Sequence, residues 1–298
     1  MINHATLLKR VTYASVATAV ILIIAKAIAW YMSGSIGILA SLIDSLMDSF
    51  ASIINLFAVR YALMPADEDH PYGHGKAEPL AGLAQASFIA GSAVFLIFNA
   101  VQRLQNPQAL SHNSAGIIVM VFSIILTVFL VLYQRHVVKI TNNLAIKADS
   151  LHYLTDLLTN FSILIALYLT IKGYLWADAV FAILIALYIF KSAFQIGNDA
   201  FQQLMDKKLD SKTEDMIIQT IHSCDQALGY HDFRTRQSGK NKFIQLHLEL
   251  DDRLSLLEAH AIADGLEKKL MALIPDAEVI IHEDPTAVID NGQWTMDN

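Results

Sequence analysis

The sequence predicts a membrane protein made of an all-α bundle of six transmembrane helices followed by a small α+β domain. Of its 298 residues 54% are hydrophobic and 16% are charged, and the mean hydropathy is +0.43. Such a composition is typical of membrane proteins. After Lys208 the long apolar runs give way to shorter patterns. We therefore expect a transmembrane domain at 1–208, an α+β domain at 209–290 and a short tail at 291–298.

The six predicted membrane helices are apolar segments of about 20 residues, the length that spans a bilayer. We expect them at 11–32, 36–63, 80–101, 115–133, 146–171 and 176–196. The second and fifth segments are the least apolar, so they should face the bundle interior or a water-filled cavity. Lys and Arg collect in one set of loops, which by the positive-inside rule places both termini in the cytoplasm.

The residues after Lys208 alternate between helical and strand patterns. Helices are expected at 213–224 and 255–274, and strands at 231–237, 242–251 and 278–282. Ser238-Gly239-Lys240-Asn241 has the composition of a hairpin turn. Ser255 and Glu258 have the spacing of a capping box at the start of the second helix. The order α-β-β-α-β is typical of a small two-layer α+β domain.

Two metal-ligand pairs lie inside the second and fifth membrane segments, namely Asp44 with Asp48 and His152 with Asp156. A spacing of four places each pair on one helix face. A charged side chain at the bilayer centre costs about 3 kcal/mol or more, so these groups should have a function. Three carboxylates and one imidazole complete a tetrahedral site for a divalent cation, which favours carriage over hydrolysis. The alternative is a polar pair that holds helices together.

Two further groups of histidines indicate metal binding outside the membrane segments. In the loop after the second segment, His70 and His74 are flanked by acids, which resembles a labile metal site; the alternative is a solvated polar loop. The α+β domain carries histidines on several elements, and the alternative there is scattered surface histidines. These residues are His231, His247, His260 and His282, with Asp284 beside the last.

Two features of composition limit the possible functions. Cys224 is the only cysteine, which excludes an intrachain disulfide and a site built of several thiolates. The part of the chain after Lys208 is acidic, which argues against binding to nucleic acids or anionic lipids.

Several stretches resemble the cation diffusion facilitator family over essentially the whole chain. They are Ser-Leu-Ile-Asp-Ser-Leu-Met-Asp, Pro-Ala-Asp-Glu-Asp-His-Pro-Tyr-Gly-His-Gly-Lys-Ala-Glu, Ala-Asp-Ser-Leu-His-Tyr-Leu-Thr-Asp, His-Asp-Phe-Arg-Thr-Arg-Gln-Ser-Gly-Lys, Phe-Ile-Gln-Leu-His-Leu-Glu-Leu and Val-Ile-Ile-His-Glu-Asp-Pro. The resemblance implies a homodimer in the cell inner membrane that exports Zn²⁺, with Cd²⁺ and Fe²⁺ as further cargoes, in exchange for protons. It implies no enzyme activity and no nucleic-acid partner.

The resemblance also implies roles for individual residues. The transport site would be Asp44, Asp48, His152 and Asp156; the loop site would be Asp67, His70 and His74; and a two-metal cluster at the dimer interface would use His231, His247, His260, His282 and Asp284. Lys76 and Asp206 would form an ion pair that interlocks the membrane–cytosol junction, and Leu151 would be a hydrophobic gate. Glu283 stands where a close relative is expected to have Gln, which affects the surroundings of the last cluster.

Two functions of other classes compete with transport. An intramembrane metallohydrolase should carry a motif such as His-Glu-x-x-His, which the sequence lacks. The other is a membrane metal sensor or binding protein that does not transport. Counterflow of Zn²⁺ and protons in proteoliposomes separates these alternatives.

Overall fold

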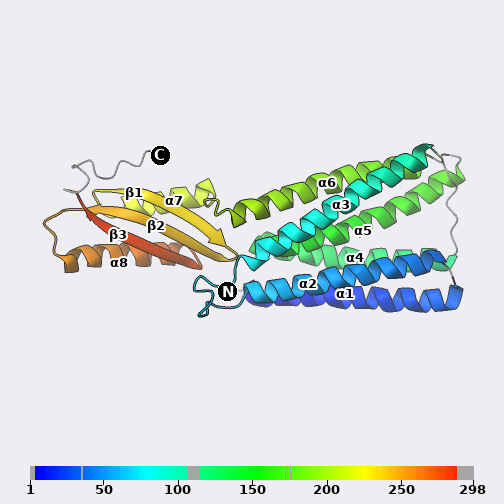
Figure 1. Ribbon diagram of the computed structural model, residues 1–298, viewed down its shortest axis with the longest axis horizontal. Helices are drawn as coiled ribbons and strands as arrows, with labels where there is room; N and C mark the ends of the chain where they lie inside the picture. Colours follow the sequence, from blue (N-terminus) through cyan, green and yellow to red (C-terminus); the bar gives the residue numbers. More distant parts are fainter. Residues whose placement is uncertain (1–3, 35, 106–113, 173, 175, 287–298) are drawn as a thin grey trace. The chain divides into compact units, whose positions relative to one another are not determined.

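The computed structural model describes residues 4–34, 36–105, 114–172, 174 and 176–286. The chain forms two compact units, Met1–Phe201 and Gln202–Asn298, which are helical and α+β respectively (Figure 1). The predicted tail at 291–298 lies outside the described residues.

Six long helices make up the first unit as far as it is described, in the predicted order. They are α1 (His4–Ser33), α2 (Ile36–Ala62), α3 (Ala77–Gln105), α4 (Ser114–Thr141), α5 (Leu144–Ile171) and α6 (Ala177–Leu204). Helices α1, α3 and α4 extend past both ends of their predicted apolar runs, whereas α5 begins earlier and α6 ends later than predicted. Helix α2 matches its predicted run closely. Five of them are long and apolar enough to cross a membrane over their described residues; α5, which carries Lys147, Asp149, His152 and Asp156, is not among these five.

Helix α5 lies inside the helical unit, as its polar residues require. It packs against α1, α2, α3 and α4. Ala148 and Leu151 of α5 also belong to a buried cluster with Ala86 of α3 and Ile189 of α6. The predicted gate residue Leu151 is thus buried where three helices meet.

The start of α5 is fixed by side-chain caps. Glu78, which is buried on α3, accepts a hydrogen bond from the Leu144 amide at 2.8 Å. The Asn143 side chain accepts another from the Ile146 amide at 2.9 Å. A Cβ at Gly82 would lie 3.3 Å from the Leu144 backbone, so glycine permits this close approach of α3 and α5. These bonds satisfy amides that a helix start otherwise leaves unpaired.

The second unit has the predicted order α-β-β-α-β. Its elements are α7 (Ser211–His222), β1 (Gly229–Ser238), β2 (Asn241–Leu250), α8 (Leu256–Leu273) and β3 (Ala277–Pro285). The strands form one sheet in the order β1-β2-β3. Strand β2 pairs antiparallel with β1 and parallel with β3, and α8 makes the crossover. The predicted capping box of Ser255 and Glu258 is confirmed.

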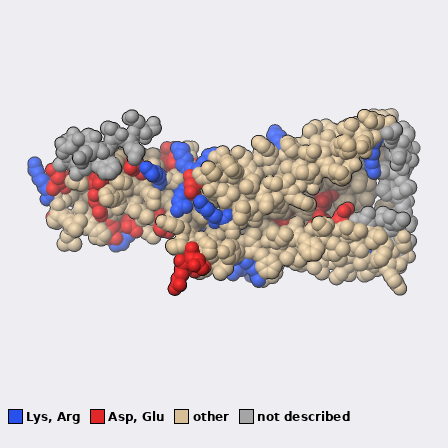
Figure 2. Space-filling model, viewed as in Figure 1, with Lys and Arg blue, Asp and Glu red and all other residues tan. Residues whose placement is uncertain are grey.

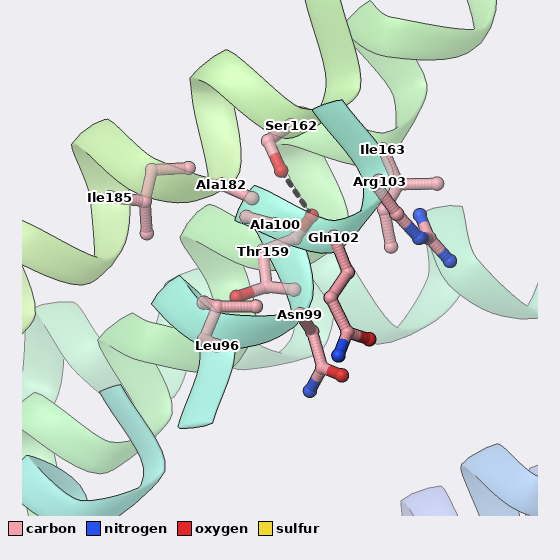
Figure 3. A pocket seen from close by; sticks show the side chains of 10 residues that line it. All are labelled: Leu96, Asn99, Ala100, Gln102, Arg103, Thr159, Ser162, Ile163, Ala182 and Ile185. Carbon is pink, nitrogen blue, oxygen red and sulfur yellow. Dashed lines mark hydrogen bonds between the residues drawn. The ribbon is translucent and has the colours of Figure 1, made fainter. Parts of the chain in front are cut away.

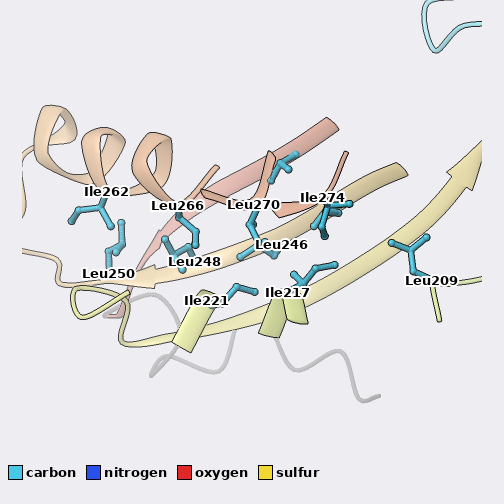
Figure 4. Packing of buried hydrophobic residues seen from close by; sticks show 12 residues of the cluster. Leu209, Ile217, Ile221, Leu246, Leu248, Leu250, Ile262, Leu266, Leu270 and Ile274 are labelled. Atoms are coloured by element: carbon cyan, nitrogen blue, oxygen red, sulfur yellow. The ribbon is translucent and has the colours of Figure 1, made fainter. Parts of the chain in front are cut away.

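The core of the second unit lies between one sheet face and the two helices (Figure 4). On β2, Ile244, Leu246, Leu248 and Leu250 are buried, while the residues between them belong to the other face. The core also includes Ile217 and Ile221 of α7 and Leu266 and Leu270 of α8. Alternation along β2 therefore leaves His247 on the sheet face opposite the core, which none of the described helices covers.

Core packing predicts that two leucines of α8 differ in their effect on stability. Leu270 is fully buried, whereas Leu273 is 44% exposed. In the unit expressed from about Leu209 onward, Leu270→Ala should lower the free energy of unfolding by about 2–5 kcal/mol. Leu273→Ala should change it by less than about 1 kcal/mol. Urea unfolding of both variants measures this, and similar losses would contradict the core assignment.

Candidate metal sites

Three of the four predicted intramembrane ligands lie together between α2 and α5. His152 Nε2 is 3.0 Å from Asp48 Oδ1 and 4.0 Å from Asp156 Oδ2. Each of the three residues offers a ligand atom within 4.8 Å of the other two. Because a single ring nitrogen faces both carboxylates, one cation or one proton can occupy the space between them. This donor set fits a divalent transition metal.

The fourth predicted ligand, Asp44, is not part of this group. It lies one helical turn before Asp48 on α2, with an exposed side chain. A carboxylate at that position is on the same helix face as Asp48. The described geometry thus gives a triad of Asp48, His152 and Asp156 with Asp44 beside it.

A buried hydrogen-bond network, which the sequence analysis did not identify, lies one helical turn before His152. Asp149 is fully buried and accepts hydrogen bonds from Ser15 Oγ at 2.8 Å and Gln134 Nε2 at 2.7 Å. Gln85 Nε2 donates to its other oxygen at 3.3 Å. The donors belong to α1, α4 and α3, so one carboxylate joins three helices to α5. The signal in the sequence was Gln134, a polar residue within an apolar helix.

Tyr153 extends this network toward α2. Its hydroxyl lies 2.8 Å from Ser52 Oγ and donates to the Ser15 carbonyl at 3.2 Å. Since Tyr153 follows His152 directly, these bonds hold the α5 turn that presents the imidazole to Asp48.

The predicted loop site is also assembled. Asp67 lies 3.2 Å from His70 Nδ1 and 3.3 Å from His74 Nε2. His74 Nδ1 is 3.2 Å from the Pro65 carbonyl, which leaves Nε2 directed at Asp67. The backbone amide of His70 donates to Asp67 and is the main reason that the pKa of this carboxyl is lowered. Asp67 therefore remains a charged oxygen donor as the pH falls toward its ordinary pKa.

In the second unit the histidines form a row across the sheet face opposite the core. His231 of β1 pairs with His247 of β2, which pairs with His282 of β3. The ring centroids of neighbours are 5.0 and 4.7 Å apart. Asp284 lies 3.2 Å from His231, 2.7 Å from His247 and 3.3 Å from His282. Three imidazoles around one carboxylate suit zinc, and His231, His247 and Asp284 have ligand atoms close enough to share one ion.

His260, the remaining predicted ligand of this cluster, is placed differently. It lies on α8, and its Nδ1 is 3.7 Å from Glu283 Oε1. The structure thus brings together His231, His247, His282 and Asp284, and it places His260 beside Glu283 rather than in their row.

The predicted interlock of Lys76 with Asp206 joins residues of different units and stays a prediction. Within the second unit, Asp206 Oδ1 is 3.4 Å from Arg236 Nη1.

A cavity of about 580 Å³ lies between α3, α5 and α6 (Figure 3). Its polar lining includes Asn99, Gln102 and Arg103 of α3 and Thr159 and Ser162 of α5. Thr159 follows Asp156 by three residues, so the cavity begins about one turn beyond the triad along α5.

Over most of the visible surface of the helical unit charged side chains are few, whereas they are frequent on the second unit (Figure 2).

The Asp149 network makes a prediction about stability. Asp149→Ala leaves the donors of Ser15, Gln85 and Gln134 without their acceptor inside the bundle. The free energy of unfolding should therefore fall by about 1–3 kcal/mol. The control is Asp199→Ala, which removes an exposed ion pair with Lys147 and should cost about 1 kcal/mol or less. Thermal unfolding of the full chain in detergent compares the two, and equal shifts would contradict a special role for Asp149.

Comparison with known proteins places this chain in a family. Residues 12–205 match the model described as "Cation efflux transmembrane domain", and residues 209–286 match "Cation efflux protein, cytoplasmic domain". Among curated relatives, the cation-efflux pump FieF of Shewanella oneidensis is 51% identical over 280 residues, covering 94% of this chain and 95% of the relative. The pump of the same name from Serratia proteamaculans is 48% identical over 291 residues, covering 98% and 97%.

Among solved structures, the metal-bound C-terminal domain of the CzcD transporter from Thermotoga maritima is similar at 26% identity and a TM-score of 0.25. The match covers 25% of this chain and 88% of the chain in that structure. The two family models together extend over nearly the whole sequence, and the two curated relatives match over 95% and 97% of their own lengths. The chain therefore belongs to the cation efflux family, the cation diffusion facilitators that its motifs predicted.

Proposed function

We propose that the protein is a proton-coupled antiporter that exports divalent metal cations, Zn²⁺ first among them, across the cell inner membrane. The observation that carries this proposal is the triad of Asp48, His152 and Asp156, which places a metal-binding donor set inside helices of membrane-spanning length. A cation efflux family member that keeps such costly groups in its bundle uses them for its cargo. All six long helices, α5 included, would span the bilayer, with both termini in the cytoplasm.

The position of His152 Nε2 between two carboxylates supports proton coupling. His152 Nε2 can hold either a metal ion or a proton, since only the neutral ring coordinates a metal. A proton on this nitrogen forms a charge-assisted hydrogen bond with Asp48 and thereby takes the place of the cation. Metal bound from the cytosol would leave on the outer side, where protons enter and displace it.

Alternating access requires a polar route between the triad and the outer side. The cavity beyond Asp156 supports such a route, because Thr159, Asn99 and Gln102 offer oxygen atoms to a hydrated ion. On the other side of the triad, Leu151 is buried among α3, α5 and α6 and would close the cytosolic path. Sliding of α3 and α6 along α5 would open the triad to one side of the membrane and close it to the other.

Cargo choice among Zn²⁺, Cd²⁺ and Fe²⁺ would be set by the oxygen-rich donor set. One imidazole and two or three carboxylates match the small tetrahedral zinc ion. Carboxylates can also bind in one- or two-oxygen mode, which accommodates larger ions such as Cd²⁺. Asp44 would join the site when metal draws the α2 carboxylates together.

The second unit would act as a cytosolic metal-binding and dimerisation domain. Its sheet face opposite the core carries the row of His231, His247 and His282 around Asp284, and this donor set fits zinc. Metal bound there would link two protomers of a homodimer, with His260 as a further ligand. The loop site of Asp67, His70 and His74 would deliver or sense metal near the membrane surface.

A membrane metal sensor that does not transport is the second candidate. The histidine row favours it, because a metal-dependent change at this partly exposed sheet face could itself act as a signal. The two functions differ in whether the intramembrane triad turns over its cargo.

The triad assignment predicts a large loss in Asp48→Asn. The amide keeps the shape of the side chain but removes one negative charge beside the ion, so affinity for Zn²⁺ should fall on the order of 100-fold. Titration of the purified protein with Zn²⁺ measures this. Asp199→Asn, on the exposed side of α6, is the control and should bind as the wild type does. An unchanged affinity of Asp48→Asn for Zn²⁺ would contradict the assignment of the triad as the metal site.

The antiport proposal predicts a pH dependence of metal binding at the triad. Below the pKa of the ligand imidazole the proton competes with metal, so Zn²⁺ affinity falls as the pH drops through the imidazole range, about 6.5 for an unperturbed group. The difference between wild type and Asp48→Asn titrations, repeated across pH, isolates this site. A difference that stays flat across the range would contradict His152 as the proton acceptor.

The second unit alone should be stabilised by zinc. At a free Zn²⁺ concentration of 100 times the dissociation constant the gain is about 2.7 kcal/mol. The double variant His247→Ala, Asp284→Asn should lose this gain, whereas His222→Ala, which lies at the end of α7 outside the row, should keep it. Thermal unfolding with and without zinc is the measurement. If zinc stabilised the double variant as much as the wild type, the alternative would be favoured, namely that these are scattered surface histidines that share no metal ion.

A further inference from the structure

Lys26 is a cation within the apolar part of α1, and the structure gives it partners on α2. Its side chain is half-buried, and Nζ donates to Ser45 Oγ at 2.6 Å and to the Ser41 carbonyl at 3.1 Å. Ser45 follows Asp44 and precedes Asp48 by three residues. The ammonium is thus held on the α2 turn between Asp44 and Asp48, the two carboxylates of that helix that were predicted as ligands.

Lys26 lies close enough to the proposed transport site to interact with its charges. The charges that act on it are those of Asp48, Asp156 and Asp44. Conversely, Lys26 acts on both Asp44 and Asp156. Its hydrogen bonds, however, go to Ser45 and to the Ser41 backbone and not to a carboxylate. Lys26 therefore influences the site through its charge while leaving the carboxylate oxygens free for a cation.

We propose that Lys26 is the resident counter-cation of the transport site and sets its affinity for metal. This inference rests on the proposed function and adds a specific residue to it. When no metal is bound, this fixed positive charge offsets part of the negative charge of the carboxylates in a low-dielectric bundle, in addition to a proton on His152. When a divalent cation binds, the same charge repels it and weakens its binding. The ammonium thereby limits affinity to a level from which metal can leave.

The size of the effect decides whether it matters for transport. At an effective dielectric constant of about 20, two unit charges still interact by more than thermal energy at a separation of about 10 Å, and a divalent ion doubles the interaction. Loss of the Lys26 charge should therefore tighten Zn²⁺ binding on the order of ten-fold. Tighter binding slows release, so the apparent KM and the maximal rate of zinc transport should fall together.

A structural role for Lys26 makes a different prediction. If Lys26 only joined α1 to α2 through Ser41 and Ser45, its removal would loosen the site and weaken metal binding. Lys26→Gln separates the two roles, since its amide can still donate to these oxygens but carries no charge. Lys26→Met removes both the charge and the donor, and Lys26→Arg keeps the charge.

The test measures Zn²⁺ affinity at about pH 8, where protons compete least with an imidazole ligand, and zinc transport by the full-length protein in liposomes. Binding is taken as the difference from Asp48→Asn, so that the loop and cytosolic sites cancel. The expected result is about ten-fold tighter binding and a lower maximal rate for Lys26→Gln and Lys26→Met, with Lys26→Arg close to wild type. Lys191→Gln, on an exposed part of α6, is the control and should match the wild type.

Two results overturn the proposal or its basis, and they differ from each other. Unchanged or weaker Zn²⁺ binding by Lys26→Gln would overturn the counter-cation role while leaving the triad in place. A wild type whose binding does not exceed that of Asp48→Asn would instead overturn the proposed transport site. If Lys26→Met does not yield folded protein, the comparison of Lys26→Gln with Lys26→Arg still decides the question.

Discussion

The helical unit is organised around ionisable side chains on the first half of α5. A charge inside an apolar bundle is costly unless other groups satisfy it, and three of these side chains have partners on other helices. Asp149 is held by Ser15, Gln85 and Gln134, and His152 faces Asp48. Lys147 pairs with Asp199. Because these partners come from α1, α2, α3, α4 and α6, satisfying the polar groups of α5 also determines which helices surround it.

This arrangement separates groups that hold the bundle from groups that are available to a cation. Asp149 is fully buried and its oxygens accept from three donors, so it has little left to offer a metal. One turn further on, Asp48 and Asp156 share a single imidazole nitrogen and remain partly exposed. One turn beyond that, the lining of the cavity starts at Thr159. Along α5, the groups that hold the bundle, the triad and the cavity thus follow each other at intervals of about one helical turn.

Much of this could be predicted from the sequence because period and spacing are local properties. The alternation of β2 and the capping box at Ser255 were both readable, and the first places His247 on the face opposite the core. The spacing of Asp48 with Asp44 and of His152 with Asp156 identified the two site helices. The partner of Asp149 on α4, the position of Lys26 over Ser45 and the separation of Asp44 from the triad were not predictable, because they depend on the rotation of one helix against another. Spacing within a helix carries no information on that rotation.

The central claim is that the triad exchanges a metal ion for protons across the membrane. Proteoliposomes with a pH-sensitive dye inside and a Zn²⁺-sensitive dye on the opposite side test it most directly, because both fluxes are recorded in one experiment. The account predicts that an imposed zinc gradient drives proton movement in the opposite direction, that an imposed proton gradient drives zinc against its own gradient, and that Asp48→Asn abolishes both. Zinc movement without proton counterflow, or counterflow that survives in Asp48→Asn, would contradict it.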